Sequence, residues 1–291
     1  MNISTFIRKA KKLGLRLGFM KFIGYKAIFT CAIRPVGSDE AFKILPHSDD
    51  YWYADPLILN RDGRDILFME RVDRHTGLGA IVYSDITDGE WSDPVPVITE
   101  NFHMSFPMCF EWQGELYMLP ETSMDRAINL YRCVSFPDKW EHAARIMDGM
   151  KLVDTVVESQ SSESITFWTS EHREGEGFYT RFRKFRIYRD ASGEIVGEDL
   201  GAIGEEYTLK SRMAGYPLKR DGHTIYPLQR STSGVYGYSV EFHRDEPLTG
   251  EMVREITPAS VRCEAGRKLI GVHTYSVSDR YEVIDVQYLA R

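Results

Sequence analysis

The sequence has 291 residues, which fit either one large β domain or two ordinary domains, and 43% of them are hydrophobic and 12% aromatic, enough for a buried core. Its 36 basic and 43 acidic residues give a net charge of −7, which argues against nucleic acid as the main partner. The four cysteines have no C-x-x-C spacing, which argues against a zinc site or a disulfide framework and indicates a reducing compartment, so neither a metal nor another cofactor is predicted.

The first 38 residues are predicted to form a basic N-terminal arm. Eight lysine and arginine residues occur before Asp39 and no acidic residue does, while Arg16 and Lys21 interrupt the apolar stretch that a signal peptide requires. Bulky apolar residues lie between the charges, so the arm suits the headgroup region of an anionic membrane. Docking of a basic helix on the acidic body of the protein is the alternative, and Gly14 and Gly18 weaken the helix. The expected location is cytoplasmic, peripheral at the inner face of the membrane if the arm binds lipid.

The stretch from Tyr51 to Arg71 predicts a β-hairpin. Its two apolar runs, 56–59 and 66–69, flank a polar turn with Asp62-Gly63, a pair that readily takes the positive φ angles of a tight turn. Asp55 opens the first strand and Glu70 ends the second. Because the strands are antiparallel, both carboxylates are expected at the same end of the hairpin.

Similar hairpins recur along the chain after Asp39. The equivalent first positions are Asp55, Phe106, Asp154, Ala214 and His273, at intervals of 51, 48, 60 and 59 residues. The first four hairpins are followed by more strand-like sequence, and four strands at such a period are typical of a propeller blade. The sequence therefore predicts an all-β, five-bladed β-propeller over residues 39–291, with a β-sandwich as the alternative. The fifth copy has only two clear strands, so we expect the segment 41–45 to complete its blade by pairing the two ends of the chain.

In a propeller, the first strand of each blade lines the central channel, so these hairpins should gather polar side chains around one mouth of it. The residues expected there are Asp55, Glu70, Ser105, Glu121, Asp154, Ser170, Arg212, Gln229 and His273, with His103 and Asp285 as further candidates. Carbohydrates need bidentate hydrogen bonds to hydroxyls and flat aromatic faces for their C–H groups. The faces are expected from Tyr51, Trp52, Tyr53, Phe106 and Trp168. This composition predicts a carbohydrate site.

Several carboxylates in one pocket allow glycosyl chemistry. We assign Asp55 as base or nucleophile, Glu121 as the first candidate for the acid with Glu70 as the second, and Asp154 as the modulator of a pKa. The predicted substrate-binding residues are His103, Ser105, Arg212, Gln229, His273 and Trp52. Each also has a purely structural interpretation: Asp55 before a proline can simply start a turn, His273 can be a core histidine, and Arg212 can merely neutralise the acids.

The Ala54-Asp55-Pro56 phrase resembles the start of the five-bladed glycosidase superfamily of arabinanases, xylosidases and invertases. That resemblance implies a base or nucleophile at the blade-one aspartate, a second aspartate that tunes a pKa, and a glutamic acid as proton donor. Asp55 and Asp154 match the first two positions in order. The segment 211–215 has no acid at the blade-four anchor, which counts against simple hydrolysis.

A longer set of phrases, spread over about residues 50–290, is similar to the N-terminal domain of plant glucosamine inositolphosphorylceramide transferases and its stand-alone bacterial relatives. The phrases are Ser105-Phe-Pro107, Tyr117–Thr122, Leu130-Tyr-Arg132, Phe136–Trp140, Ser211–Gly215, Tyr236-Gly-Tyr238 and Gly271–Thr274. This resemblance implies a glycan-related role in the assembly of cell-surface polysaccharide or glycolipid. Together with the predicted site, we expect glycosyl transfer or glycoside cleavage on a glycan or nucleotide-sugar substrate. The competing interpretation is a non-catalytic module that binds a glycan or nucleotide-sugar, or that scaffolds a glycosyltransferase.

Overall fold

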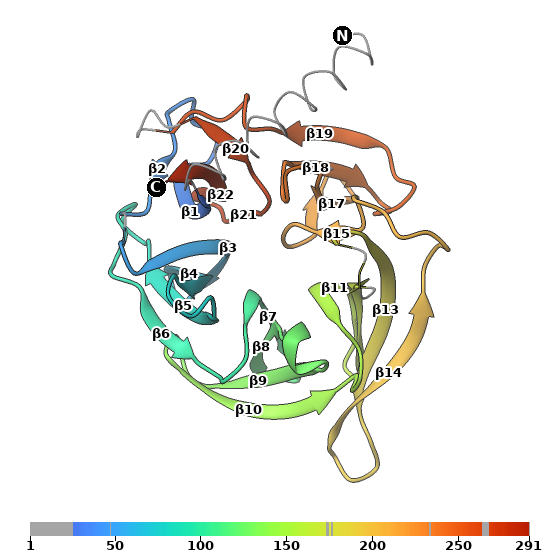
Figure 1. Ribbon diagram of the computed structural model, residues 1–291. Helices are drawn as coiled ribbons and strands as arrows, with labels where there is room; N and C mark the ends of the chain where they lie inside the picture. Colours follow the sequence, from blue (N-terminus) through green and yellow to red (C-terminus); the bar gives the residue numbers. More distant parts are fainter. Residues whose placement is uncertain are drawn as a thin grey trace.

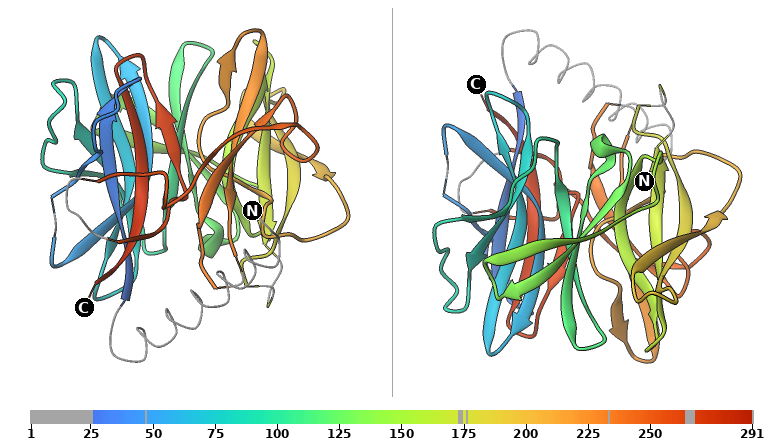
Figure 2. Two further views of the ribbon diagram at one scale, coloured as in Figure 1. Left: turned by 90° about the horizontal axis from the view of Figure 1, so that it is seen from above. Right: turned by 90° about the horizontal axis from the view of Figure 1, so that it is seen from below.

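The computed structural model describes residues 26–46, 48–172, 175, 177–232, 234–263 and 268–290. Within these ranges, 22 strands form five antiparallel sheets that are arranged as blades around a central axis (Figure 1). Seen from the side, the blades stand next to one another with their inner strands running along that axis (Figure 2). The predicted all-β, five-bladed β-propeller is confirmed.

Each blade takes consecutive strands from the chain, except the fifth. Blade one consists of β3 (Tyr51–Arg61), β4 (Arg64–Asp73), β5 (Gly79–Asp85) and β6 (Val95–Ile98). Blade two consists of β7 (Ser105–Trp112), β8 (Glu115–Glu121), β9 (Ile128–Ser135) and β10 (Lys139–Ile146), with the short 3₁₀ helix η1 (Ser123–Asp125) after β8. Blade three consists of β11 (Leu152–Gln160), β12 (Ser164–His172), β13 (Thr180–Arg189) and β14 (Ile195–Ala202). Blade four consists of β15 (Arg212–Met213), β16 (Leu218–Arg220), β17 (His223–Arg230), β18 (Ser239–Arg244) and β19 (Met252–Ile256).

Blade five joins the two ends of the described chain. It contains β20 (Leu269–Gly271), β21 (Tyr275–Val277) and β22 (Tyr281–Ala290), followed outward by β1 (Lys26–Pro35) and β2 (Lys43–Ile44). Strand β1 pairs with β22 through ten residue pairs, from Lys26 opposite Ala290 to Pro35 opposite Tyr281. The outermost strand β2 lies within the segment 41–45 that the sequence indicated.

The position of β1 corrects the predicted boundary between arm and propeller at residue 38. Strand β1 (Lys26–Pro35) belongs to the ring, because it pairs with β22 and its Ile28, Cys31 and Ile33 are buried. Within the part of the chain that the structure describes, the ring therefore begins with Lys26, inside the segment that was assigned to the arm. The rest of the predicted arm, residues 1–25, lies outside the described residues. Binding of the arm to a membrane therefore stays a prediction. Among the described residues, no helix is long and apolar enough to cross one.

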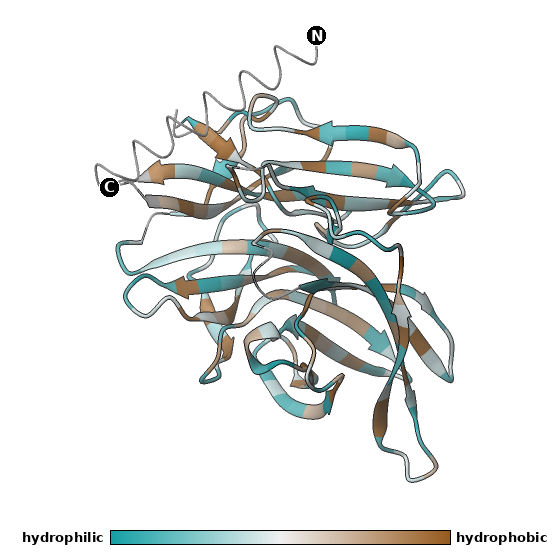
Figure 3. Ribbon diagram, turned by 45° about the vertical axis from the view of Figure 1, so that its right-hand side comes forward, coloured by the Kyte–Doolittle hydropathy of each residue, from teal (hydrophilic) through white to brown (hydrophobic). Residues whose placement is uncertain are grey.

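The blades are held together by the buried faces of their strands. Hydrophobic and hydrophilic residues alternate along many strands, while the connecting loops are largely hydrophilic (Figure 3). Between blades two and three, the ring of Phe110 lies 5.4 Å from that of Phe167, which stacks on Phe185 at 4.9 Å. The predicted tight turn at Asp62-Gly63 is present, with φ angles of 54° and 76°. This packing fixes the ring on which the polar mouth is built.

An ion pair between Arg280 and Asp65 joins blade five to blade one. Arg280 Nε lies 2.7 Å from Oδ2 of Asp65, a side chain without solvent exposure, and Arg280 also donates to the carbonyl oxygens of Gly63 and Thr87. Asp65 Oδ1 accepts a further hydrogen bond from Asn60 Nδ2 at 2.9 Å. Asp65 therefore depends on Arg280 for its countercharge.

Arg280→Ala is expected to lower the free energy of unfolding by about 1–3 kcal/mol, because it leaves a buried carboxylate without its cation, although the arginine itself is 41% exposed. Urea unfolding followed by tryptophan fluorescence measures this loss. Arg64→Ala is the matched control, since its partner Asp85 is 29% exposed and the pair is expected to contribute less than about 1 kcal/mol. Equal losses in the two variants would show that the Asp65 pair has no special role.

Candidate functional site

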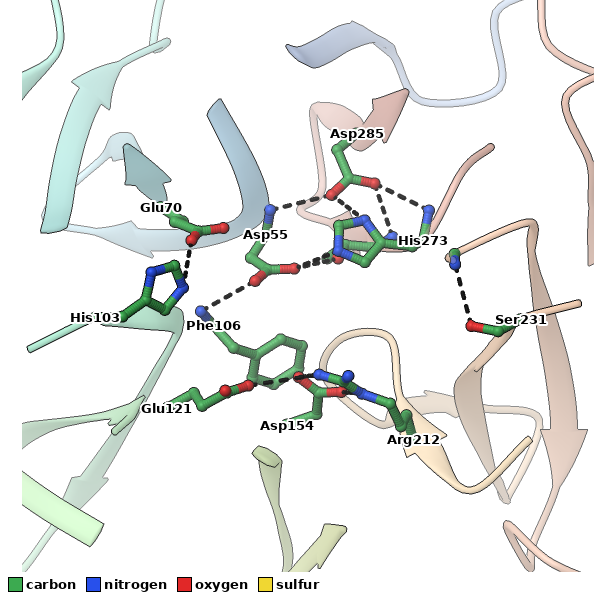
Figure 4. A network of polar contacts seen from close by, with 12 residues as sticks. Asp55, Glu70, His103, Phe106, Glu121, Asp154, Arg212, Ser231, His273 and Asp285 are labelled. Carbon is green, nitrogen blue, oxygen red and sulfur yellow. Dashed lines mark hydrogen bonds and ion pairs between the residues drawn. The ribbon is translucent and has the colours of Figure 1, made fainter. Parts of the chain in front are cut away.

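The first strands of blades one, two and three are interrupted at the same point. Asp55, Phe106 and Asp154 all have left-handed backbone conformations, with φ angles of 50°, 45° and 49°. The strand pairing shifts there in each blade, between Ala54 and Leu57, between Ser105 and Met108, and between Val153 and Val156. Such bulges redirect side chains, and a left-handed conformation is uncommon for a residue as bulky as Phe106. The three predicted anchors thus share a backbone feature that brings their side chains together at one mouth of the channel (Figure 4).

The anchors of blades four and five lack this feature. Ala214 lies between β15 and β16, and His273 lies between β20 and β21, and neither has a positive φ angle. The side chain that blade four contributes to the mouth is that of Arg212, two residues before Ala214. Figure 4 shows the resulting polar groups, which fall into three clusters.

The first cluster is a chain of two buried carboxylates with an imidazole between them. His273 Nε2 lies 3.2 Å from Asp55 Oδ1, and His273 Nδ1 lies 2.6 Å from Asp285 Oδ2. Asp285 also accepts the backbone N–H groups of Asp55, His273 and Thr274 at 2.9–3.1 Å, so it ties blade five to blade one. Asp55 in turn accepts the Thr274 hydroxyl at 2.8 Å and the Phe106 N–H at 3.2 Å.

These contacts set the charges of the first cluster. Burial opposes a charge on His273, but Asp285 and Asp55 outweigh it and raise the pKa of His273 well above its usual range. Burial also disfavours an ionised Asp55, yet the charge and hydrogen bond of His273 and the Thr274 hydroxyl lower the pKa of Asp55 below its usual value. These contacts therefore favour a protonated His273 beside an ionised Asp55.

The same three side chains are the one group of described residues with the spacing of a metal site. Asp55, His273 and Asp285 each offer a ligand atom, and these atoms lie within 4.8 Å of one another. A metal needs a neutral imidazole, whereas the two carboxylates favour a protonated His273. The donor set thus suits a proton on His273 better than a divalent cation.

The second cluster joins blades two, three and four. The Arg212 guanidinium forms a two-pronged ion pair with Asp154, through Nε to Oδ2 and through Nη2 to Oδ1 at 3.0 Å, and its Nη2 lies 3.5 Å from Glu121 Oε2. The Ser123 hydroxyl at η1 donates to Glu121 Oε1 at 2.8 Å. Burial raises the pKa of Glu121 to about 7, with Arg212 opposing this rise and Asp154 adding to it. Burial likewise raises the pKa of Asp154 against the opposing charge of Arg212.

The third cluster pairs Glu70 with His103. His103 Nε2 lies 2.9 Å from Glu70 Oε1, and burial raises the pKa of Glu70. His103 Nδ1 accepts the Gly79 N–H at 3.0 Å, so the ring hydrogen in this arrangement is on Nε2. Burial opposes a charge on His103, but Glu70 outweighs it and raises the pKa of His103 to about 9. A proton on Nδ1 would break the bond to Gly79, which works against this rise. Gly79 is needed here, because a Cβ would lie 2.4 Å from the Met104 carbonyl oxygen and 2.8 Å from Glu70 Oε1.

The structure thus brings together eight of the predicted site residues: Asp55, Glu70, His103, Glu121, Asp154, Arg212, His273 and Asp285. Ser105 lies opposite Glu121 in blade two and Gln229 lies opposite Arg212 in blade four, and both are as buried as the clustered residues. Ser170 Oγ and Gln229 Nε2 have no hydrogen-bond partner among the described residues. Both residues are close to the second cluster, since Ser170 lies opposite Val153, the neighbour of Asp154, and Gln229 lies opposite Arg212.

The aromatic faces differ from those expected. Tyr53, Phe106 and Trp168 are buried, so they present no open face, while Trp52 is partly exposed. The ring of Trp52 lies 5.7 Å from that of Phe29 on β1, which in turn lies 4.5 Å from the imidazole of His273. Sequence reasoning missed Phe29 because its strand was assigned to the arm. It did not identify Tyr236 as a site residue, because Tyr236 belongs to the loop between β17 and β18; the Arg212 guanidinium lies over its ring.

The fold of this chain is similar to that of solved carbohydrate-active enzymes. The β-1,2-mannobiose phosphorylase of Listeria innocua, in complex with β-1,2-mannobiose, has a TM-score of 0.52 at 10% identity, over 88% of this chain and 96% of that one. The α-L-arabinofuranosidase of Podospora anserina, in complex with cellotriose, has a TM-score of 0.54 at 11% identity, over 83% and 93% of the two chains. At these identities the likeness concerns the fold.

The chain belongs to the family described as glucosamine inositolphosphorylceramide transferase 1, N-terminal, which matches residues 28–291. Curated relatives with the name glucosamine inositolphosphorylceramide transferase 1 come from Oryza sativa subsp. indica, 26% identical over 250 residues, and from Arabidopsis thaliana, 26% identical over 224 residues. These alignments cover 81% and 74% of this chain but 31% and 28% of the relatives. The chain therefore spans about a third of their length. The predicted resemblance to this family is confirmed.

Proposed function

We propose that the mouth binds a glycan and catalyses glycosyl transfer or glycoside cleavage in the assembly of a cell-surface polysaccharide or glycolipid. The observation that supports this most is the opposite shift of two acids at one mouth: the pKa of Glu121 is raised to about 7 and that of Asp55 is lowered. Two carboxyl groups whose environments push their pKa values apart are the usual sign of an acid and a base that work together.

In this proposal Glu121 is the general acid and Asp55 is the base or nucleophile. Near neutral pH, part of Glu121 is protonated and can donate its proton to the glycosidic oxygen as the bond to the anomeric carbon breaks. Ionised Asp55 either takes a proton from the attacking hydroxyl or attacks the anomeric carbon itself. Arg212 holds Asp154 in place and balances its charge, which limits how far the pKa of Glu121 rises. The side chains of Glu121 and Arg212 are 11% and 10% exposed, so a ligand in the mouth can reach them.

A non-catalytic binding module is the second candidate, and one observation favours it. Both oxygens of Asp55 already face donors of the protein, since Oδ1 meets Thr274 and His273 and Oδ2 meets the Phe106 N–H. An acid held in this way suits the binding of hydroxyl groups as well as catalysis. The names of the plant relatives make glucosamine the first sugar to test in either case.

If Glu121 is the general acid, turnover is expected to fall as the pH rises through about 7, because the acid then loses the proton that it must donate. The test is a pH profile from 5 to 9 on a panel of glucosamine-containing disaccharides and nucleotide-sugars. Glu121→Gln should remove turnover at every pH, whereas Glu163→Gln, at an exposed turn of blade three, should leave the profile unchanged.

Turnover that persists in Glu121→Gln, or that increases up to pH 9, would eliminate Glu121 as the acid. Sugar binding without turnover in the unaltered protein would instead support the binding module.

A further inference from the structure

A tightly built segment around Tyr236 and Gly237, in the loop between β17 and β18 of blade four, packs against blade five at the mouth. The Gly237 N–H donates to Ser231 Oγ at 3.1 Å (Figure 4), and Gly237 has a φ angle of 60°. A Cβ on Gly237 would lie 2.4 Å from His273 Cβ, and one on Gly271 would lie 2.4 Å from the Gly237 carbonyl oxygen. Two glycines are thus needed to let this segment rest directly on blade five, so the position of Tyr236 is fixed by backbone fit.

Tyr236 stands between the first and second clusters. Its ring lies under the Arg212 guanidinium, at 5.2 Å, and 5.5 Å from the imidazole of His273. Burial raises the pKa of Tyr236 well above its usual range despite the opposing charge of Arg212, and Asp154, Asp55 and Glu121 add to the rise. Its hydroxyl therefore stays neutral and can both donate and accept a hydrogen bond.

The aromatic surface continues outward from Tyr236 to the rim of the mouth. Its ring is partly exposed and lies 5.1 Å from that of Phe178, which is 42% exposed in the turn before β13 of blade three. Neither ring has a role in the acid–base chemistry proposed above. An aromatic pair beside polar groups is an arrangement that packs against the C–H face of a sugar, and the backbone fit that holds Tyr236 reduces the entropy lost on binding.

We infer that Tyr236 and Phe178 form a stacking platform for a second sugar ring, next to the sugar that Asp55 and Glu121 contact. This inference rests on the proposed glycan binding and makes it more specific: the ligand has at least two sugar rings, and the outer ring lies over blades three and four. Tyr236 is then a specificity residue, because it distinguishes a disaccharide unit from a free monosaccharide.

The test is the ratio of two dissociation constants, one for a monosaccharide and one for its disaccharide, measured by isothermal titration calorimetry. The probes are glucosamine, mannose and arabinose, each paired with its own disaccharide. We expect the unaltered protein to bind the disaccharide of at least one pair roughly threefold to tenfold more tightly, which is the range of one aromatic stacking contact. Tyr236→Ala and Phe178→Ala should each reduce this ratio towards one, while Tyr236→Phe should keep most of it. Tyr188→Ala is the matched control, since Tyr188 is a similarly exposed tyrosine on the outer part of blade three.

The outcomes separate this inference from the proposed function. Monosaccharide binding with no gain for any disaccharide, or a gain that survives in both alanine variants, would overturn the platform and leave glycan binding intact. No binding of any of the six sugars at millimolar concentration would overturn both. Because each variant is compared with itself, a general weakening of the mouth cancels in the ratio.

Discussion

Truncation of the chain after Gly271 is expected to abolish cooperative folding. The removed residues include β21 and β22, and β22 lies inside blade five, with β1 on one side and β20 and β21 on the other. Its Val283, Ile284 and Val286 are buried in two of the hydrophobic cores. Without β22, the ring has two open blade edges and Asp55 loses its contact with Asp285. Thermal denaturation followed by circular dichroism should show no cooperative transition.

A short deletion in an exposed turn, which removes no strand, provides the comparison. Removal of residues 191–193, at the exposed turn between β13 and β14, should leave a cooperative transition near the original temperature. If the chain truncated after Gly271 also melts cooperatively near that temperature, blade five is not required to close the ring.

Asp55→Asn is expected to reduce turnover by about three to four orders of magnitude while the protein stays folded. The amide cannot act as base or nucleophile, but asparagine tolerates the left-handed conformation that Asp55 adopts, with φ 50°. Sugar affinity should persist, since an amide still forms hydrogen bonds with hydroxyl groups. Turnover, sugar affinity and melting temperature are measured on the same preparation.

Asp62→Asn is the matched control, because Asp62 is an exposed aspartate with a φ angle of 54° at the turn of the same hairpin. It should change neither turnover nor affinity. Near-original turnover in Asp55→Asn would mean that Asp55 has a structural role only. Altered affinity in Asp55→Asn with no turnover in the unaltered protein would identify a binding module.

The fold could be predicted because each blade begins with a hairpin that short stretches of sequence indicate. The Asp62-Gly63 and Asp221-Gly222 turns adopt the positive φ angles that their residue types favour, and each lies between the first two strands of a blade. The polar residues of the mouth followed from the same repeat, since antiparallel pairing places Glu70 opposite Ala54 and Glu121 opposite Ser105. Spacing and hairpin geometry were therefore enough to group acids that are far apart in the sequence.

The parts that were missed depend on contacts between distant segments. Strand β1 has the apolar run of a buried strand, but its basic surroundings led to its assignment to the arm, and its partner β22 is at the other end of the chain. Tyr236 and Phe178 lie in loops, where no period indicates which way a side chain points. The opposite pKa shifts of Asp55 and Glu121 depend on which cation each acid contacts, and residue spacing alone does not determine that.

The pairing of β1 with β22 also determines the order in which the blades can form while the chain is synthesised on the ribosome. Blades one to four are each built from neighbouring strands, so each can form soon after its own residues emerge. Strand β1 emerges before all of them, yet its partner is made after them, and until then its apolar residues Ile28, Cys31 and Ile33 have no blade to join. Ring closure is consequently a late, long-range step of folding. A nascent chain with four finished blades still exposes the unpaired, apolar strand β1 to chaperones and to other chains.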